Sequence, residues 1–289
     1  MTAQLMPFEM VDTAEEFYTA IQQRFDRNVR NGWGNALGGE FEGHLHKPGH
    51  AFPELRVPEF LKIRADRCCA PRLSNCQDSL FTPEVHLGRL EALTIPAKTV
   101  DGLMAEAVAR FEEIDEVSAE MGLEYRDDPV IPVPDDYMTT VLPELRTSER
   151  FLRLTPTQIR AALSVACIQF QRGVRSWDQA IAVYRACVEE LDTFMSMGDR
   201  SGGRRLGLYP QWVSPELADP PMLRSKEEAW EHARRFGYYN APKGWWGWIR
   251  INYRNGTVEV RVYDASRDIS HIRGIAEHFA HVTAPYVDP

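Results

Sequence analysis

The stretch WIRINYRNGTVEVRVYD, residues 248–264, predicts a β-hairpin around which the rest of the chain is organised. Two runs of alternating apolar and polar residues flank Asn255-Gly256, the dipeptide most typical of a two-residue type I′ turn. Counting outward from that turn places Asn252 opposite Glu259 and Arg250 opposite Arg261. The hairpin therefore predicts both a strand register and the faces on which its side chains lie.

The hairpin has one apolar face and one polar face, because side chains alternate between the two sides of a strand. The apolar face is predicted to lie in the core and consists of Ile249, Ile251, Tyr253, Val258, Val260 and Val262. The polar face consists of Arg250, Asn252, Arg254, Glu259, Arg261 and Tyr263. Like charges directly opposite one another disfavour a sheet by up to roughly 1 kcal/mol. The polar face is therefore either a site for an anion or the solvated outer face of a two-layer protein.

Length and composition indicate a globular protein whose core fits one large domain or two ordinary ones. The 289 residues are 44% hydrophobic and 26% charged, and no stretch requires a domain linker, so we expect a single domain over residues 1–289. The net charge of −9 argues against a general binder of nucleic acids or anionic membranes, but it leaves room for a local basic pocket. No apolar run approaches the roughly 18 residues that a membrane-spanning helix needs.

Cysteine usage and the first residues of the chain predict a reduced, cytoplasmic setting. The five cysteines are an odd number in a long chain, and the N-terminal residues lack a signal-peptide pattern. Cys68, Cys69 and Cys76 lie close together in sequence, but their spacing matches no zinc-binding pattern and no fourth ligand is evident. Nucleophilic catalysis is poorly supported as well, because the chain has no Gly-x-Ser-x-Gly motif.

Strand and helix patterns interleave along the chain. Amphipathic stripes and capping residues predict helices at residues 12–31, 99–121, 156–163, 177–196, 225–236 and 268–282. Alternating or extended patterns predict strands, besides the hairpin, at residues 36–45, 52–66, 78–94 and 165–174. The strand patterns favour hairpins and mixed pairing, so we expect an α+β fold with helices covering one face of a largely antiparallel sheet.

Four carboxylates outside the hairpin are candidate metal ligands. Glu40 and Glu42 are two residues apart on a predicted strand, so both point to one face, where they repel one another unless a cation such as Mg²⁺ or Mn²⁺ binds them. Glu84 and Glu91 follow, and Glu91 interrupts an apolar run, which predicts a partner for it if it is buried. Each of these patterns is also typical of a surface or edge strand.

Two later segments are candidates for ligand contact. Gln169 and Gln171 alternate with apolar residues on one predicted strand, so two amides share a face that either binds a ligand or faces water. The segment 198–209 is rich in glycine and basic residues, and its Arg204 and Arg205 are suited to a carboxylate or phosphate. It lacks the Gly-Lys-Ser/Thr ending of a P-loop, and an exposed loop is the alternative.

The order of these segments resembles the glutamate–cysteine ligase family, within the carboxylate–amine ligases related to glutamine synthetase. The resemblance rests on GEFE at residues 39–42, on Glu84 and Glu91 running into LTIP at 93–96, on IQFQ at 168–171 and on TVEVRVYD at 257–264. These segments span residues 38–264, which is nearly the whole chain, and the last strand is the most specific of them.

The resemblance implies a funnel-shaped, mostly antiparallel sheet and an ATP-dependent ligase. In such an enzyme, divalent cations hold ATP, the γ-phosphoryl group passes to a substrate carboxylate, and an amine displaces phosphate from the acyl phosphate to form an amide. Glutamate is the expected acid, and the expected cofactors are ATP and Mg²⁺ or Mn²⁺. Carried over position by position, the implied metal ligands are Glu40, Glu42, Glu84, Glu91 and Glu259.

The resemblance also implies catalytic and binding roles for the remaining candidates. Arg261, with Glu259, matches the group that stabilises the transferring phosphoryl. Phosphoryl transfer needs charge neutralisation more than covalent help, so metal ions and an arginine suffice. The expected nucleotide contacts are Arg250, Asn252, Gln169 and Gln171. A looser match assigns the substrate's carboxylate to Arg204, Arg205 and Tyr209.

The sequence departs from the family at Gln169, where the family usually has a metal-binding histidine. An amide oxygen binds Mg²⁺ more weakly, and an amide is no base. The departure leaves two alternatives to a ligase. One is a ligase-fold protein that binds a nucleotide or metabolite as a sensor or scaffold, and the other is a phosphotransferase that stops at a phosphorylated small molecule.

Overall fold

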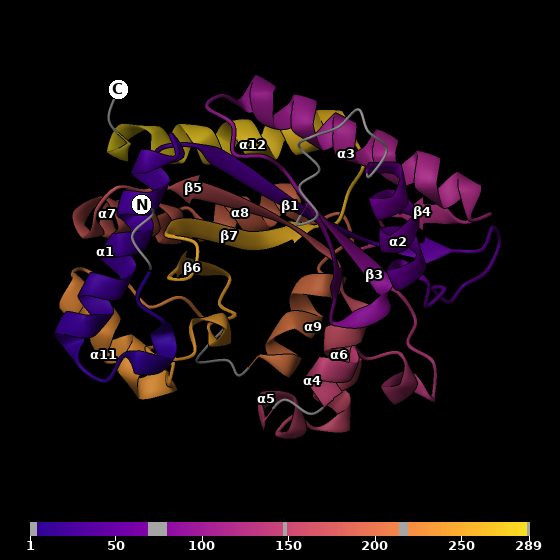
Figure 1. Cartoon of the computed structure of the whole chain (residues 1–289), viewed down its shortest axis with the longest axis horizontal. Helices are drawn as coiled ribbons and strands as arrows, with labels where there is room; N and C mark the ends of the chain where they lie inside the picture. Colours follow the sequence, from indigo (N-terminus) through magenta and orange to yellow (C-terminus); the bar gives the residue numbers. More distant parts are fainter. Residues whose placement is uncertain (1–4, 69–79, 147–148, 214–218, 288–289) are drawn as a thin grey trace.

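The fold is organised around one antiparallel sheet of seven strands (Figure 1). The computed structural model describes residues 5–68, 80–146, 149–213 and 219–287. The strand order is β2-β3-β1-β5-β7-β6, with β4 paired to β1. The strands are β1 (Leu37–His46), β2 (Phe81–Glu84), β3 (His86–Leu93), β4 (Glu124–Arg126), β5 (Cys167–Gly173), β6 (Ile249–Asn252) and β7 (Thr257–Asp264). All pairings are antiparallel, which confirms the predicted α+β class.

The helices that pack against one face of the sheet (Figure 1) include α3 (Val100–Glu120), α7 (Trp177–Glu189), α8 (Leu191–Gly198) and α12 (Ile269–Thr283). Phe41 of β1 contacts Phe111 of α3 with ring centroids 5.4 Å apart, and Phe170 of β5 stacks on Phe279 of α12 at 5.9 Å. These aromatic side chains belong to the main hydrophobic core. Because the apolar side chains of the strands point to the helices, the alternating polar side chains point to the opposite face.

The remaining helices lie around this sheet, and several begin at predicted capping residues. They are α1 (Ala14–Arg30), α2 (Val57–Cys68), α4 (Pro143–Arg146), α5 (Glu149–Leu152), α6 (Pro156–Ser164), α9 (Arg204–Trp212) and α11 (Lys226–Phe236). The side chains of Thr13, Thr99, Ser176 and Ser225 each accept a hydrogen bond from the backbone N–H three residues further on. The capping signals in the sequence are therefore confirmed.

The hairpin exists, but its predicted register is wrong by two residues. Arg250 pairs with Glu259 rather than with Arg261, because residues 253–256 form a longer connection than a two-residue turn. Tyr253 is buried in the core, and β6 ends directly before it, at Asn252. A shift of two residues leaves each paired side chain on its predicted face. It also replaces the expected repulsion between two arginines by an ion pair between Arg250 and Glu259.

A β-bulge in β7 moves Tyr263 from the predicted polar face into the core. The pairing with β5 gains one residue between Val260 and Tyr263, so Arg261 and Val262 together lie opposite Gln169. The extra residue reverses the alternation of side chains beyond this point. Tyr263 is consequently fully buried among the core aromatic residues.

Two predicted elements differ from the structure in type or length. Much of the predicted strand 52–66 is the helix α2, in which Pro58 occupies the second position, where a helix needs no backbone N–H donor. Phe60 of this helix is buried. The predicted helix 177–196 is two helices, α7 and α8, which meet at Glu190, where the backbone leaves the helical conformation (φ −96°, ψ 7°).

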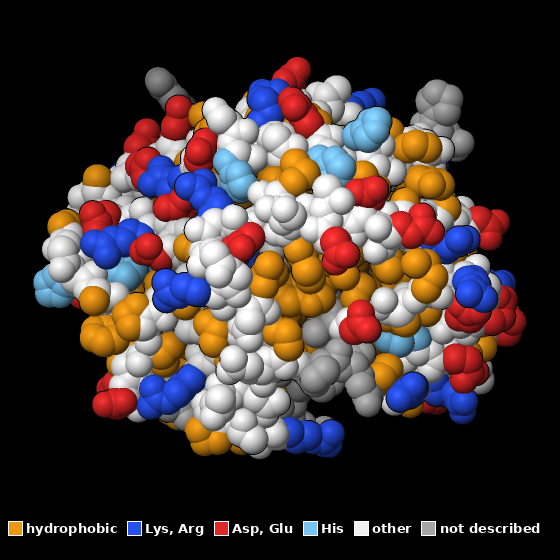
Figure 2. Space-filling view, turned by 180° about the vertical axis from the view of Figure 1, so that it is seen from behind, with side chains coloured by type: hydrophobic (Ala, Val, Ile, Leu, Met, Phe, Trp, Pro, Cys, Tyr) orange, Lys and Arg blue, Asp and Glu red, His pale blue; other side chains and the backbone are white. Residues whose placement is uncertain are grey.

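Charged side chains of both signs are interspersed over the face shown in Figure 2. Among the described helices, none is long and apolar enough to cross a membrane. Most of the predicted irregular segment 67–77 lies outside the described residues, together with Cys69, Cys76 and the side chain of Cys68. The funnel shape and the single domain over residues 1–289 stay predictions.

Substitution of Gly198 by alanine is expected to destabilise the fold. Gly198 ends α8 against β7, and a Cβ there would lie 2.6 Å from Cδ1 and 2.8 Å from Cα of Tyr263. Such overpacking is expected to lower the free energy of unfolding by about 1–3 kcal/mol, measured by urea denaturation. The matched control is Gly207→Ala in α9, where an added Cβ meets nothing within 4 Å. Equal effects of the two substitutions would contradict this packing.

Candidate functional site

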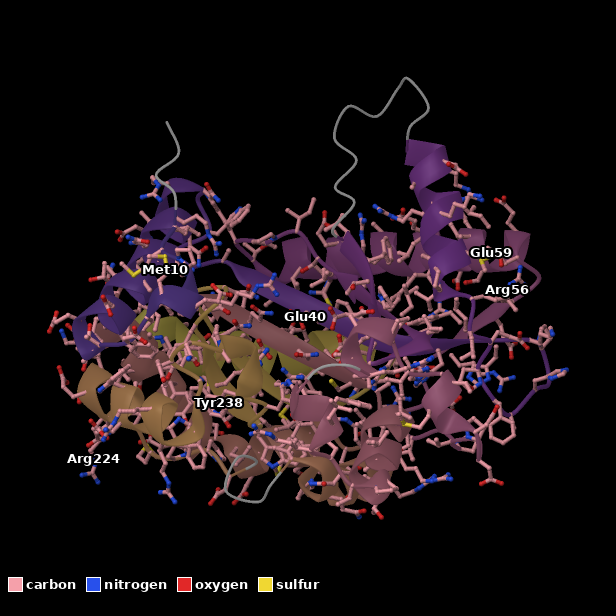
Figure 3. All side chains as sticks on the ribbon, turned by 60° about the horizontal axis from the view of Figure 1, so that its bottom comes forward. Met10, Glu40, Arg56, Glu59, Arg224 and Tyr238 are labelled. Carbon is pink, nitrogen blue, oxygen red and sulfur yellow. The ribbon has the colours of Figure 1, made fainter. Side chains whose placement is uncertain are left out.

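The polar face of the sheet lines a cavity of about 270 Å³. Six strands contribute to its wall, and Glu40 lies near the middle of the molecule in Figure 3. The residues that line this central cavity are Glu40, Thr82, Glu84, Glu91, Gln169, Pro242, Trp246, Arg250, Asn252, Arg254, Asn255 and Arg261. The fold thus brings together candidate residues from all the segments that carry the resemblance.

An acidic cluster, consisting of Glu42, Glu84 and Glu91, lies on one side of the central cavity. Carboxylate oxygens of these three residues all lie within 4.8 Å of one another. Glu42 and Glu91 pair across β1 and β3. Glu84 ends β2 directly before Val85, whose φ of 62° is rare for a β-branched residue. Such backbone strain persists only where the surrounding structure imposes it. Here the strained residue directly follows Glu84, whose carboxylate belongs to the acidic cluster.

The electrostatics of the cluster favour binding of a cation. Burial raises the pKa of Glu84 and of Glu91, and neighbouring carboxylates raise both pKa values further. Burial also raises the pKa of Glu40 to about 8, with Glu259 adding to this effect and Arg261 opposing it. A carboxyl group with a raised pKa keeps its proton to a higher pH than usual, unless a positive charge replaces that proton. Their oxygens are the donors that Mg²⁺ and Mn²⁺ prefer.

Glu42 is held in place by donors from β5. Its Oε2 accepts the backbone N–H of Cys167 at 3.1 Å, and its Oε1 accepts the side-chain amide of Gln169 at 2.9 Å and the Cys167 thiol at 3.2 Å. Because the amide nitrogen of Gln169 donates to Glu42, the amide oxygen Oε1 of Gln169 remains available to bind a ligand. That oxygen is buried and has no hydrogen-bond partner among the described residues. It is a further oxygen donor beside the acidic cluster.

The opposite side of the central cavity is basic and is organised by Glu259. The carboxylate of Glu259 is fully buried, and its Oε1 lies 2.9 Å from Nη2 of Arg250 and 3.0 Å from Nη1 of Arg261. Its Oε2 accepts from Asn252 Nδ2 at 2.7 Å. Burial alone would raise the pKa of Glu259, but Arg250 and Arg261 lower it below its usual value. Glu259 therefore stays charged and holds both guanidinium groups.

The β-bulge that carries Arg261 is braced by Arg205. A bulge removes ladder partners from backbone carbonyls. Arg205 donates to the carbonyl of Arg261 at 2.8 Å and to that of Val262 at 3.0 Å, and its side chain is completely buried. The resemblance assigns Arg205 to the substrate's carboxylate, whereas in the structure both of its Nη groups donate to the backbone of β7. It positions Arg261.

Arg204 and Tyr209, the other two candidates from the segment 198–209, lie with Arg205 in the helix α9 rather than in a loop, and neither lines the central cavity. Arg204 is exposed at the start of α9 and is not among the residues that line the cavity. Tyr209 is buried, stacks on Trp248 with ring centroids 4.0 Å apart, and donates its hydroxyl to the carbonyl of Trp246 at 2.6 Å. Trp246 lines the cavity, so Tyr209 supports its wall.

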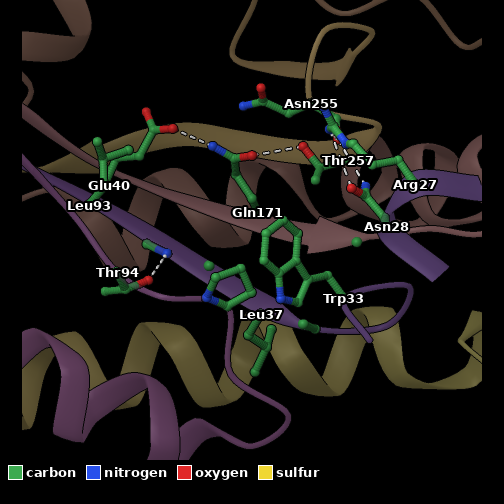
Figure 4. A pocket seen from close by; sticks show the side chains of 15 residues that line it. Arg27, Asn28, Trp33, Leu37, Glu40, Leu93, Thr94, Gln171, Asn255 and Thr257 are labelled. Carbon is green, nitrogen blue, oxygen red and sulfur yellow. Dashed lines mark hydrogen bonds between the residues drawn. The ribbon is translucent and has the colours of Figure 1, made fainter. Parts of the chain in front are cut away.

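Glu40 and Gln171 connect the two sides of the polar face. Gln171 donates its amide to Oε1 of Glu40 and accepts the hydroxyl of Thr257 at 2.8 Å (Figure 4). Glu40 interacts with the acidic cluster through Glu84 and with the basic side through Arg261. It therefore lies between the two charged groups of the site.

Two residues that contact Glu42, Arg89 and Cys167, are not among the site residues predicted from the sequence. Arg89 is buried, and its Nη1 lies 3.6 Å from Oε2 of Glu42. Cys167 contacts both oxygens of the same carboxylate. Arg89 precedes Glu91 by two residues and Cys167 precedes Gln169 by two residues, so the alternation of side chains along each strand contains the signal for both.

No protein-family model and no curated protein sequence matches the chain. Among solved structures, it is similar to a bifunctional glutathione synthetase from Pasteurella multocida, with a TM-score of 0.52 and 10% identity over 90% of this chain and 39% of that one. GmaS in complex with ADP (TM-score 0.45, 11% identity, 96% and 61% covered) and glutamine synthetase from Plasmodium falciparum (0.45, 9%, 96% and 56%) are also similar. The chain thus spans between 39% and 61% of the length of these proteins. The first similarity shows a shared fold.

Proposed function

We propose that this chain is an ATP- and Mg²⁺-dependent carboxylate–amine ligase that activates an amino-acid carboxylate, glutamate first, and joins it to an amine. The observation that carries this proposal is one cavity with an acidic cluster on one side and the Arg250–Glu259–Arg261 group on the other. Phosphoryl transfer from ATP needs such a combination of negative and positive charge. The fold shared with a protein named as a glutathione synthetase supports the same class of reaction.

Glu42, Glu84 and Glu91 would hold Mg²⁺ or Mn²⁺, with Glu40 beside them. The donor set fits a hard cation, because three carboxylates converge within 4.8 Å and the side-chain oxygen of Gln169, which has no hydrogen-bond partner in the described part of the chain, lies next to Glu42. The cation, when bound, supplies neutralisation of the ATP phosphates. The sequence also predicts Glu259 as a metal ligand. Its oxygens already accept from two arginines and an amide, so a metal role requires one of these contacts to open.

The arginines are proposed to act on the phosphoryl group in transit. Arg261 stabilises the negative charge that develops on it, and Arg250 is a second contact for the phosphates. Both guanidinium groups are held by Glu259 before substrate arrives, so little reorganisation is needed in the transition state. The substrate carboxylate takes the phosphoryl group, ADP leaves, and the acyl phosphate then reacts with the amine.

A second candidate function is nucleotide binding without ligation. The observation that favours it is Gln169, whose amide is no base and whose nitrogen already donates to Glu42. Under this candidate the chain binds ATP and Mg²⁺ but forms no amide.

The proposal is tested by incubation with ATP, Mg²⁺, glutamate and hydroxylamine, a small nucleophile that traps acyl phosphates as hydroxamates. A ligase is expected to form hydroxamate and ADP in equal amounts, and only when the amino acid is present. Calorimetric binding of ATP with no hydroxamate from any acid in a pool of amino acids would support the second candidate instead.

Substitution of Arg261 by alanine is expected to lower the rate of ADP formation by about 10²–10³-fold, because it removes a preorganised positive charge from the transition state. Glu259→Gln is expected to lower it as well, since both arginines lose their charged partner. The readout is kcat for glutamate-dependent ADP release. The matched control is Arg224→Ala, which changes an exposed arginine at the periphery of the molecule (Figure 3). A rate that survives Arg261→Ala would show that the site is wrongly assigned.

Without a divalent cation, the free energy of unfolding is expected to fall as the pH rises from about 6 to about 9. The pKa values of Glu84 and Glu91 are raised and that of Glu40 is about 8, so the folded protein binds more protons than the unfolded chain in this window. Mg²⁺ takes the place of these protons, so its stabilising effect is expected to grow with pH.

This pH dependence is measured by urea denaturation at the two pH values, with and without Mg²⁺. Glu91→Gln removes one of the repelling charges and is expected to weaken both the pH dependence and the effect of Mg²⁺. Stabilisation by Mg²⁺ that is the same at both pH values would argue against a metal site at the acidic cluster.

A further inference from the structure

A second cavity, of about 310 Å³, lies at the ends of the strands where β1 begins (Figure 4). It borders the central cavity, because Glu40 and Asn255 line both. Most of its wall is apolar and comes from Trp33, Leu37, Leu93 and Pro96, with Gly38 contributing only backbone. We refer to it as the side cavity.

We propose that the side cavity receives the amine substrate, and that this substrate is a primary monoamine carrying an apolar or aromatic group. This inference rests on the proposed ligase function and names the class of its acceptor. An apolar wall next to a few polar groups is typical of a site for a small organic molecule rather than for ammonia. The indole of Trp33 is 37% exposed, so it offers an aromatic surface to such a group.

Polar groups in two parts of the side cavity orient an amine. Glu40 lies at the end that borders the central cavity, where Gln171 holds its carboxylate (Figure 4). Arg27 and Asn28 lie apart from Glu40, with Gln171 and Thr257 between them (Figure 4), and both donate to the backbone carbonyl of Asn255 at 3.0 and 2.9 Å. A carboxyl oxygen accepts a hydrogen bond from the N–H of an amine in either protonation state, whereas a guanidinium repels an ammonium. The nitrogen of a monoamine therefore faces Glu40, whereas a diamine places its second charge near Arg27.

This orientation points the nitrogen toward the place where the acyl phosphate is proposed to form, since Glu40 and Arg261 line the same central cavity. The amine enters as ammonium and gives one proton to solvent. Its nitrogen lone pair then forms a bond to the carbonyl carbon, and the carbon–oxygen bond to phosphate breaks. The leaving phosphate takes that electron pair and the second amine proton, so the products are an amide and hydrogen phosphate.

Gly38 gives a selective way to fill the side cavity. It pairs with Gln171 in the sheet, and a Cβ added there meets only Cβ of Gln171, at 3.9 Å. Valine at this position is expected to fold, because β-branched residues suit a strand. By contrast, a Cβ on the neighbouring Gly39 meets the ring of Phe41 at 3.0 Å. Gly38→Val therefore tests the cavity without disturbing the core.

The experiment compares phenethylamine, ammonia and 1,4-diaminobutane as acceptors, with hydroxylamine as the small reference nucleophile. The wild-type protein is expected to prefer phenethylamine to the other two acceptors by about tenfold or more in kcat/KM. Gly38→Val and Trp33→Ala are each expected to lower the ratio of kcat/KM for phenethylamine to that for hydroxylamine by about tenfold. Trp33→Phe is expected to retain most of that ratio, and Gly207→Ala all of it.

Binding of phenethylamine by calorimetry gives a readout that does not depend on turnover. Binding that Gly38→Val abolishes supports the inference even if no hydroxamate forms, in which case the proposed ligase function fails separately. If hydroxamate forms, but ammonia or the diamine is used as well as phenethylamine, the inference is overturned and the ligase function stands. A ratio unchanged by both Gly38→Val and Trp33→Ala would overturn it as well.

Discussion

Repulsion among the carboxylates of Glu42, Glu84 and Glu91, of which Glu42 and Glu91 are buried and Glu84 is half-buried, is the constraint on which this structure depends. Three such groups within 4.8 Å cannot all be ionised in the protein interior without compensation. Hydrogen-bond donors from β5 hold Glu42. The pKa values of Glu84 and Glu91 are raised, so bound protons reduce the repulsion that a bound cation would otherwise reduce. Because this cluster of carboxylates lowers stability and lies beside a cavity, we infer that it serves to bind a ligand rather than to stabilise the fold.

A positively charged group lies across the central cavity from these carboxylates, on the same polar face of the sheet. Glu259 keeps two guanidinium groups close together, and the bulge in β7 sets the place of Arg261 opposite Gln169. Arg205 donates hydrogen bonds to the backbone carbonyls of Arg261 and Val262 and so stabilises the bulge. The cavity between the two charged sides is therefore a product of strand pairing, and the helices on the far face secure it through the aromatic core.

Much of the arrangement of the site could be predicted from the sequence, because a register error of two residues leaves each side chain on the same face of the strand. The hairpin prediction misplaced Arg250 by two residues, yet its side chain stayed on the polar face. The order of the acidic segments identified the carboxylates that converge. A one-residue bulge reverses alternation, however, and nothing local in the sequence marks it, so Tyr263 was placed on the wrong face. The role of Arg205 was equally hidden, since its acceptors are backbone carbonyls about 56 residues away.

Transfer of oxygen from the substrate's carboxylate to phosphate is the most direct test of the central claim, that the cavity activates a carboxylate by phosphorylation. Glutamate labelled with ¹⁸O in both carboxylates is incubated with the protein, ATP, Mg²⁺ and an amine, and the released phosphate is analysed by mass spectrometry. If the carboxylate is phosphorylated, one labelled oxygen is expected in phosphate for each amide formed. Release of unlabelled phosphate, or label found in AMP, would contradict it.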